Sequence, residues 1–186
     1  MWLASKASHG YMHDNHAAWY RESVQRDACL PFLRALEAPY LAICTDVDEI
    51  PNMAALLPHL DAIARHPGPV RLDMAFFYYS FAWMKPERWR HGFVASGTVL
   101  AAESIDALRT RWSPAAPCIP DAGWHCSYFD APHDLSRKLQ SFSHREFDTD
   151  ANRDLGHIVR CRATGKDLFG RPHEDCVPTP PGMALP

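Results

Sequence analysis

The sequence predicts an α/β domain in which helices flank a mixed, mostly parallel central sheet. Segments with helical spacing of apolar residues alternate with short runs of β-branched and aromatic residues, which is the pattern of such a fold. The length of 186 residues, with 47% hydrophobic and 22% charged residues, suits one domain with a sizeable core. We expect this domain to cover residues 1–171 and an extended, proline-rich tail to follow over residues 172–186.

Each element is predicted from local signals along the chain. Caps, apolar spacing and proline or glycine stops predict helices over residues 15–37, 53–66, 104–111, 132–147 and 152–163. Runs of β-branched and aromatic residues predict strands over residues 40–45, 70–83, 92–100 and 123–129. Pro31 is expected to kink or split the first helix, and Gly165 to stop the last one. Because a nucleotide-binding α/β sheet usually opens with a strand, we expect the usual first strand region to be lacking.

Charge and hydropathy exclude several classes of function. The formal net charge is −3 and the basic residues are scattered, which argues against a nucleic-acid-binding surface. The longest strongly apolar run, residues 74–84, is much shorter than the ~20 residues of a membrane-spanning helix, and the chain shows no secretory signal. We therefore expect no membrane segment in this chain. A cytoplasmic or otherwise soluble location is predicted, with Golgi residence only if an N-terminal anchor exists.

A cluster of acidic residues follows the first predicted strand. Residues 45–51 read Thr-Asp-Val-Asp-Glu-Ile-Pro, directly after the apolar run. Ligand sites in open α/β sheets lie at the carboxyl ends of strands, which is where this motif is placed. In an extended backbone Asp46 and Asp48, two residues apart, point to the same side. Two such carboxylates can hold a hard divalent cation, and that cation can bind a diphosphate.

The acidic motif has two other interpretations. A solvated turn that caps the next helix is the simplest, but the buried strand before the motif and Glu49-Ile50-Pro51 after it favour the metal site. Haloacid dehalogenase-type phosphatases also carry Asp-x-Asp after a strand, with the first Asp as nucleophile. They are expected to have a small β-branched residue where Ile50 stands and a later strand that ends in paired acids. No later apolar strand of this sequence ends in such a pair, so the phosphatase is the less favoured alternative.

Five stretches, taken in order along the chain, resemble glycosyltransferase family 17, whose best-known members are the β-1,4-mannosyl-glycoprotein 4-β-N-acetylglucosaminyltransferases. The stretches lie within residues 21–27, 46–51, 123–127, 138–146 and 164–171. The resemblance implies a GT-A type fold and an inverting transfer of a sugar, N-acetylglucosamine being expected, from a UDP-sugar to a glycan acceptor. It also implies a divalent metal ion, Mn²⁺ or similar, at Asp46 and Asp48.

Nucleotide-binding residues are expected just before and within the acidic motif. Arg26, Asp27 and Asp46 are the predicted set, and Arg26 would make a charge-assisted contact to the diphosphate. The alternative role of Arg26 is an ion pair on the helix surface with Glu22, four residues earlier. Both roles remain open for Arg26 at the level of sequence.

An inverting transfer also needs a base that takes the proton of the acceptor hydroxyl. The candidates are Asp121, His125 and Glu146. We prefer Glu146, because two neighbouring phenylalanines would shield its carboxylate and raise its pKa towards neutrality. On a helix, Glu146 and His144 would lie on different faces and would not act together.

A second class of function stays open beside the enzyme. A non-catalytic or degenerate sugar-binding domain of the same fold would need only the strands that face the acceptor. The missing first strand region would also expose a sheet edge, from which we expect self-association.

Overall fold

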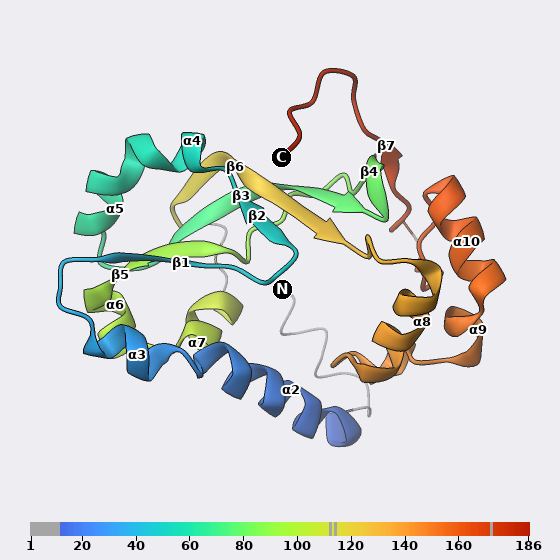
Figure 1. Cartoon of the computed structure of the whole chain (residues 1–186), viewed down its shortest axis with the longest axis horizontal. Coiled ribbons are helices and arrows are strands. Elements are labelled where there is room, and N and C mark those ends of the chain that lie inside the picture. Colours follow the sequence, from blue (N-terminus) through green and yellow to red (C-terminus); the bar gives the residue numbers. More distant parts are fainter. Residues whose placement is uncertain (1–11, 112, 114, 172) are drawn as a thin grey trace.

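The computed structural model describes residues 12–111, 113, 115–171 and 173–186. Within these residues, seven strands form one sheet with helices on both faces (Figure 1). The strands are β1 (Leu41–Cys44), β2 (Glu49–Pro51), β3 (Val70–Tyr78), β4 (Ser80–Met84), β5 (Phe93–Ser96), β6 (Cys118–Ser127) and β7 (Val177–Pro178). The helices are α2 (Met12–Asp27), α3 (Leu30–Ala35), α4 (Met53–Leu56), α5 (Leu60–Arg65), α6 (Gly97–Ala102), α7 (Ile105–Thr110), α8 (Pro132–Ser141), α9 (Asp150–Arg153) and α10 (Leu155–Thr164). Two 3₁₀ turns, η1 (Leu57–His59) and η2 (Arg145–Phe147), complete the described elements.

The strand directions differ from the prediction. The strands run in the order β1-β5-β3-β4-β7, and β6 pairs with β3 and with β2. Among these described strands, five of the six pairings are antiparallel, and only β3 with β6 is parallel. The mostly parallel, Rossmann-like sheet of GT-A type predicted from the sequence is therefore wrong.

Tight reversals of the chain explain this difference. The apolar run 70–83 is not one strand, because Tyr79 takes a left-handed φ of 69° and turns β3 back into β4. The predicted strand 92–100 stops at Ser96, and helix α6 follows immediately. An apolar run indicates that a strand is buried, but not whether it runs parallel or antiparallel to its neighbour. A hairpin and a helical crossover therefore cannot be distinguished from such runs alone.

Local signals placed several helix ends correctly. The side chain of Ser104 accepts a hydrogen bond from the Ala107 backbone N–H at 3.0 Å and caps α7. Gly165 ends α10 in the left-handed conformation with φ 68°. Pro31 lies in the first turn of α3, where a proline begins a helix instead of kinking one. The first predicted helix is thus split into two helices, α2 and α3, which is one of the two outcomes expected at Pro31.

Strand β5 separates two hydrophobic clusters because its successive side chains point to opposite faces. Val94 packs with Leu56 and Ile63 on the face covered by α4 and α5. Phe93 packs with Leu30 and residues of α6 and α7 on the other face. In Figure 1 the first pair of helices lies above the strands, and α3, α6 and α7 lie below them.

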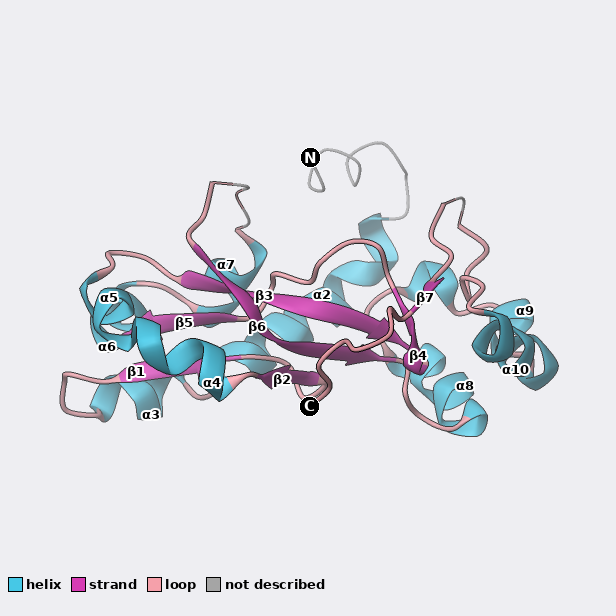
Figure 2. Cartoon of the chain, turned by 90° about the horizontal axis from the view of Figure 1, so that it is seen from above, coloured by secondary structure: helices cyan, strands magenta, loops and turns pink. Residues whose placement is uncertain are grey.

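The third hydrophobic cluster lies at the other end of the sheet. It joins β3 to α8 and α10 through Tyr78, Leu135, Leu139 and Ile158, all nearly inaccessible to solvent. In both views α8, α9 and α10 group together beyond β4 and β7 (Figures 1 and 2). The C-terminal segment reaches the sheet as well, since β7 pairs with β4. Within the described residues, no helix is both long and apolar enough to span a bilayer.

Candidate functional site

The acidic motif forms the connection between β1 and β2. It folds as a turn, closed by a hydrogen bond from the Glu49 backbone N–H to the Asp46 carbonyl at 3.0 Å. The spacing predicted that Asp46 and Asp48 would share one side of an extended strand. This prediction is wrong, because the two residues lie in a turn. Asp46 Oδ2 lies 2.6 Å from Arg109 Nη2, whereas Asp48 Oδ1 lies 3.6 Å from His125 Nδ1. The side chain of Val47, at the tip of the turn, is fully exposed.

Glu49 anchors this turn from below through a buried ion pair with Arg109. The two residues are only 3% and 4% exposed. Arg109 donates to both carboxylate oxygens of Glu49, at 3.1 Å to Oε2 and at shorter range to Oε1. Trp89 Nε1 donates to Oε1 at 2.5 Å, and the Asp46 backbone N–H donates to Oε2 at 3.0 Å. Burial alone would raise the pKa of Glu49, but the hydrogen bonds and charge of Arg109, with Trp89, lower it, so the carboxylate is ionised.

Arg26 reaches the same turn from the end of α2. Its guanidinium contacts Asp106 at 2.9 Å and Asp46 at 3.4 Å, and it also pairs with Glu22. The helix-surface ion pair with Glu22 is therefore present, and the contact of Arg26 to the diphosphate stays a prediction. Burial alone would lower the pKa of Arg26, yet these carboxylates raise it. Asp27, predicted to bind nucleotide, accepts a hydrogen bond from the Asp106 backbone N–H at 3.1 Å and so supports the start of α7.

A cavity of about 250 Å³ lies beside Asp46, between β1 and helices α2, α3 and α7. We call it the β1 cavity. It is lined by Arg26, Cys29, Leu33, Ala42, Ile43, Cys44, Thr45, Asp46, Ile105 and Arg109. Two of the predicted residues, Arg26 and Asp46, therefore lie in its wall, together with Arg109.

His125 lies on β6 directly opposite Glu49 of β2. It is 5% exposed, and its ring stacks on Trp89 with the centroids 4.1 Å apart. Burial lowers the pKa of His125, although Asp48 acts in the opposite direction, so the ring is neutral near pH 7. Its Nδ1 has no hydrogen-bond partner among the described residues. Of the three candidate bases, His125 is the one beside the acidic turn.

The other two candidate bases lie on separate segments. The Asp121 side chain is 86% exposed and pairs with Arg88 at 2.9 Å, four residues before His125 on β6. Glu146 lies in η2 and contacts His144 Nδ1 at 2.8 Å. The prediction that Glu146 and His144 lie on different faces of one helix is wrong, because α8 ends at Ser141 and the chain changes course before η2.

Helix α2 connects the Glu146 segment with the β1 cavity. The ring of Trp19 meets the ring of His144 edge-on, with the centroids 4.8 Å apart. Trp19 and Arg26 are seven residues apart and share one face of the helix, so they lie about 10 Å apart along its axis. The structure thus brings the first, second and third resembling stretches together at the acidic turn. The fourth stretch contacts the same helix, α2, about 10 Å further along its axis.

A model of glycosyltransferase family 17 matches residues 3–175 of the chain. The chain belongs to glycosyltransferase family 17. The predicted family is confirmed, and with it a glycosyltransferase activity that uses a sugar donor and an acceptor. No curated protein and no solved structure matches the chain.

The fourth and fifth stretches of this family 17 chain support each other. Phe169 stacks on Phe142 of the fourth stretch, with the centroids 6.5 Å apart, and on Phe147, the residue after that stretch, at 4.2 Å. The Arg171 guanidinium lies over the rings of Phe147 and Phe169. Asp167 accepts from the Arg171 side chain at 2.7 Å, and the buried amine of Lys85 lies 3.6 Å from the same carboxylate. This segment therefore holds η2, and Glu146 with it, against the body of the protein.

The family 17 chain offers few ligands to a metal ion at the predicted pair of aspartates. Asp46 fits poorly, because the guanidinium groups of Arg109 and Arg26 already contact one of its oxygens and would repel a cation. Asp48 fits better, with 28% of its side chain exposed. In the part of the chain that the structure describes, no three His, Cys, Asp or Glu side chains cluster as a metal site. A cation would fit here when Asp48 and substrate phosphates hold it together.

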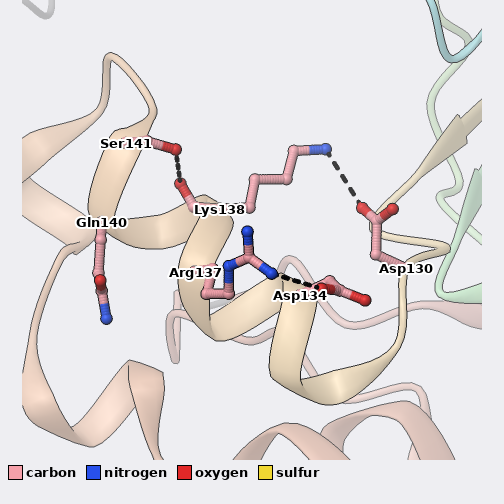
Figure 3. Close-up of a pocket in the computed structure, with 6 residues that line it drawn as sticks. All are labelled: Asp130, Asp134, Arg137, Lys138, Gln140 and Ser141. Carbon is pink, nitrogen blue, oxygen red and sulfur yellow. Dashed lines mark hydrogen bonds and ion pairs between the residues drawn. The ribbon is translucent and has the colours of Figure 1, made fainter.

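A larger hollow, of about 630 Å³, lies on the surface of α8 (Figure 3). It is lined by Asp130, Asp134, Arg137, Lys138, Gln140 and Ser141. Its charged side chains are largely exposed and pair with one another, Arg137 with Asp134 at 3.4 Å and Lys138 with Asp130 at 3.8 Å. None of its lining residues belongs to the acidic turn, so we assign the chemistry to the smaller β1 cavity and its surroundings.

Proposed function

We propose that this glycosyltransferase moves N-acetylglucosamine from a UDP-sugar to a hydroxyl group of a glycan acceptor, with inversion at the anomeric carbon. The observation that carries the proposal is the acidic turn, held by Arg109 and Arg26 beside a cavity of about 250 Å³. A donor and an acceptor are needed by any member of family 17. The sugar, the nucleotide and the inversion rest on the resemblance.

The reaction forms one bond and breaks another at the same carbon. The acceptor oxygen attacks the anomeric carbon, the bond from that carbon to the diphosphate oxygen breaks, and UDP leaves with the electron pair. Charge develops on the departing diphosphate, so cationic groups that are already in place lower the barrier. Arg26 and Arg109 are such groups, because their carboxylate partners orient them before substrate binds.

A divalent cation would add to this stabilisation. Asp48 is the residue that would hold it, together with the diphosphate oxygens of the donor. When bound, the cation acts as a Lewis acid on those oxygens. Asp46 then serves a different purpose, since it orients Arg109 and Arg26.

Glu146 is the proposed base. Its side chain is 36% exposed, so an acceptor can reach it, and His144 fixes its position through Nδ1 at 2.8 Å. The ionised carboxylate takes the proton of the acceptor hydroxyl as that oxygen attacks. His125 is buried against Trp89, and Asp121 pairs with Arg88 on the surface, which makes both less suitable for an incoming glycan.

The test compares Asp48→Asn with Asp61→Asn, an exposed aspartate on α5. Calorimetry measures the binding of UDP with Mn²⁺, and release of UDP from UDP-N-acetylglucosamine measures turnover. We expect Asp48→Asn to lose the Mn²⁺-dependent part of binding and most turnover, because a neutral amide is a poor ligand for a hard cation. Asp61→Asn should behave as the parent.

Three outcomes would contradict parts of this proposal. Equal binding and turnover by Asp48→Asn and the parent would remove Asp48 from the site. Binding of UDP by a parent that never turns over, even with glycan acceptors, would favour the non-catalytic sugar-binding domain. Near-parental turnover of Glu146→Ala, with loss in Asp121→Ala or His125→Ala, would move the base to β6.

A further inference from the structure

We propose that the β1 cavity binds the heterocyclic base of the donor nucleotide, and that it takes only the base. This inference rests on the proposed function, because it presupposes a nucleotide sugar. It adds to that function a binding site that the acidic motif does not predict, built mainly from α3, β1 and α7.

The size of the cavity suits a single ring. A dry apolar cavity of roughly 150 Å³ holds one benzene molecule, and pockets for whole drug-sized ligands begin at roughly 300 Å³. The β1 cavity, at about 250 Å³, lies between these limits. It has room for a ring with its exocyclic atoms, and the ribose, diphosphate and sugar must then lie outside it.

The walls of the cavity match the two chemical characters of a base. Leu33, Ala42 and Ile105 give it apolar surfaces, against which the flat faces of a ring can pack. Arg26 and Asp46 add a donor and an acceptor at one end. The edge of a base carries acceptors, which are carbonyl oxygens or ring nitrogens, and N–H donors. It can therefore pair with the Arg26 donor and with the Asp46 acceptor.

A buried donor without a partner supports this assignment. Among the described residues, Arg26 Nε is buried and has no hydrogen-bond partner, although both terminal nitrogens of the same guanidinium are engaged. A buried donor that lacks an acceptor is costly, and such groups often mark a position that a ligand occupies. A carbonyl oxygen of the base would accept this hydrogen bond once the Arg26 side chain rotates enough to open Nε to the cavity.

The order of residues along the acidic turn indicates where the rest of the donor lies relative to the base. Thr45 and Asp46 line the cavity, and Asp48 follows two residues later on the same turn. With the base in the cavity, the rest of the donor extends out at the end where Arg26, Arg109 and Asp46 meet, and the diphosphate lies just beyond that end. This order agrees with a cation held by Asp48 and the diphosphate.

The thiol of Cys29 can serve as a chemical probe for this site without any substitution. Cys29 lines the cavity and is exposed, so a maleimide can label it, and a bound base would cover it. Cys118 is also exposed but lies at the start of β6, outside the cavity lining, and serves as the internal control. Peptide mass spectrometry follows the labelling rate of both thiols in the same sample, with UMP or with ribose 5-phosphate, which lacks the base.

We expect UMP to protect Cys29 and leave Cys118 unchanged. At a UMP concentration of ten times its Kd, only about one eleventh of the protein is free, so labelling of Cys29 slows about tenfold. Ribose 5-phosphate at the same concentration should leave the rate within about twofold of the unliganded protein, because it does not reach into the cavity.

The outcomes separate this inference from the proposed function. If the parent turns over UDP-N-acetylglucosamine but UMP does not protect Cys29, the base binds elsewhere and only this inference fails. Equal protection by ribose 5-phosphate, or equal protection of Cys118, would also overturn it. If UMP protects Cys29 and no turnover occurs with any acceptor, the base site stands and the transfer reaction fails.

Discussion

Replacing Glu49 with glutamine removes the charge that the buried Arg109 needs. The substitution leaves a guanidinium that is only 4% exposed with Asp46 as its remaining carboxylate partner. Breaking one side of a buried ion pair costs about 3–5 kcal/mol, and the surviving contact to Asp46 places the expected loss near the lower end, at about 3 kcal/mol. In a chain of this size, that loss lowers the Tm by roughly 6–12 °C.

The control for this prediction is an exposed ion pair in the same protein. Glu103 pairs with Arg111 at 2.9 Å, but their side chains are 35% and 67% exposed. Glu103→Gln should therefore cost less than about 1 kcal/mol. Urea unfolding, followed by circular dichroism, gives both free energies of unfolding. If Glu49→Gln destabilises the protein no more than Glu103→Gln does, the view that this buried pair anchors the turn is refuted.

Two further predictions concern pH and the end of α10. Because the folded-state pKa of Glu49 lies below its ordinary value near 4.5, the stability advantage of the parent over Glu49→Gln should be complete above pH 4.5 and shrink as the pH falls through the folded-state pKa, which urea titrations at several pH values would show. Gly165→Ala should cost more than Gly170→Ala. Both positions have a left-handed φ and lose about 1–2 kcal/mol from strain, but a Cβ at Gly165 would also lie 2.6 Å from the Trp83 ring, while at Gly170 it meets no described atom within 4 Å. Equal unfolding free energies for the two variants would contradict this.

The existence of most elements follows from short stretches of sequence. The run 40–45 forms β1, the residues after Ser104 form α7, and Gly165 ends α10, as predicted. Each of these features depends on neighbours within about one helical turn: a cap, a stop or a run of apolar residues. The family follows from five such stretches as well, because their order along the chain is itself a property of sequence.

Strand direction lies beyond such local signals. Whether β3 continues or turns back at Tyr79 depends on one residue with a positive φ, and aromatic residues at such positions are rare enough that no pattern predicts them. Parallel and antiparallel neighbours can carry the same apolar residues when both faces of a strand are buried, as they are in β5. The predicted parallel sheet failed for this reason.

The candidate site divides in the same way. The sequence by itself determined that Asp46, Asp48 and Glu49 follow a short strand, and that the chain is a family 17 glycosyltransferase. The predicted burial of that strand is wrong, because β1 is only partly covered and Ile43 is 39% exposed. Only the tertiary structure decided their roles. It brings Arg109, 60 residues from Glu49, and Trp89, 40 residues away, onto one carboxylate. Ion pairs and buried hydrogen bonds depend on distance in space and on exclusion of water. For segments far apart in the chain, the sequence spacing indicates neither their distance in space nor their burial.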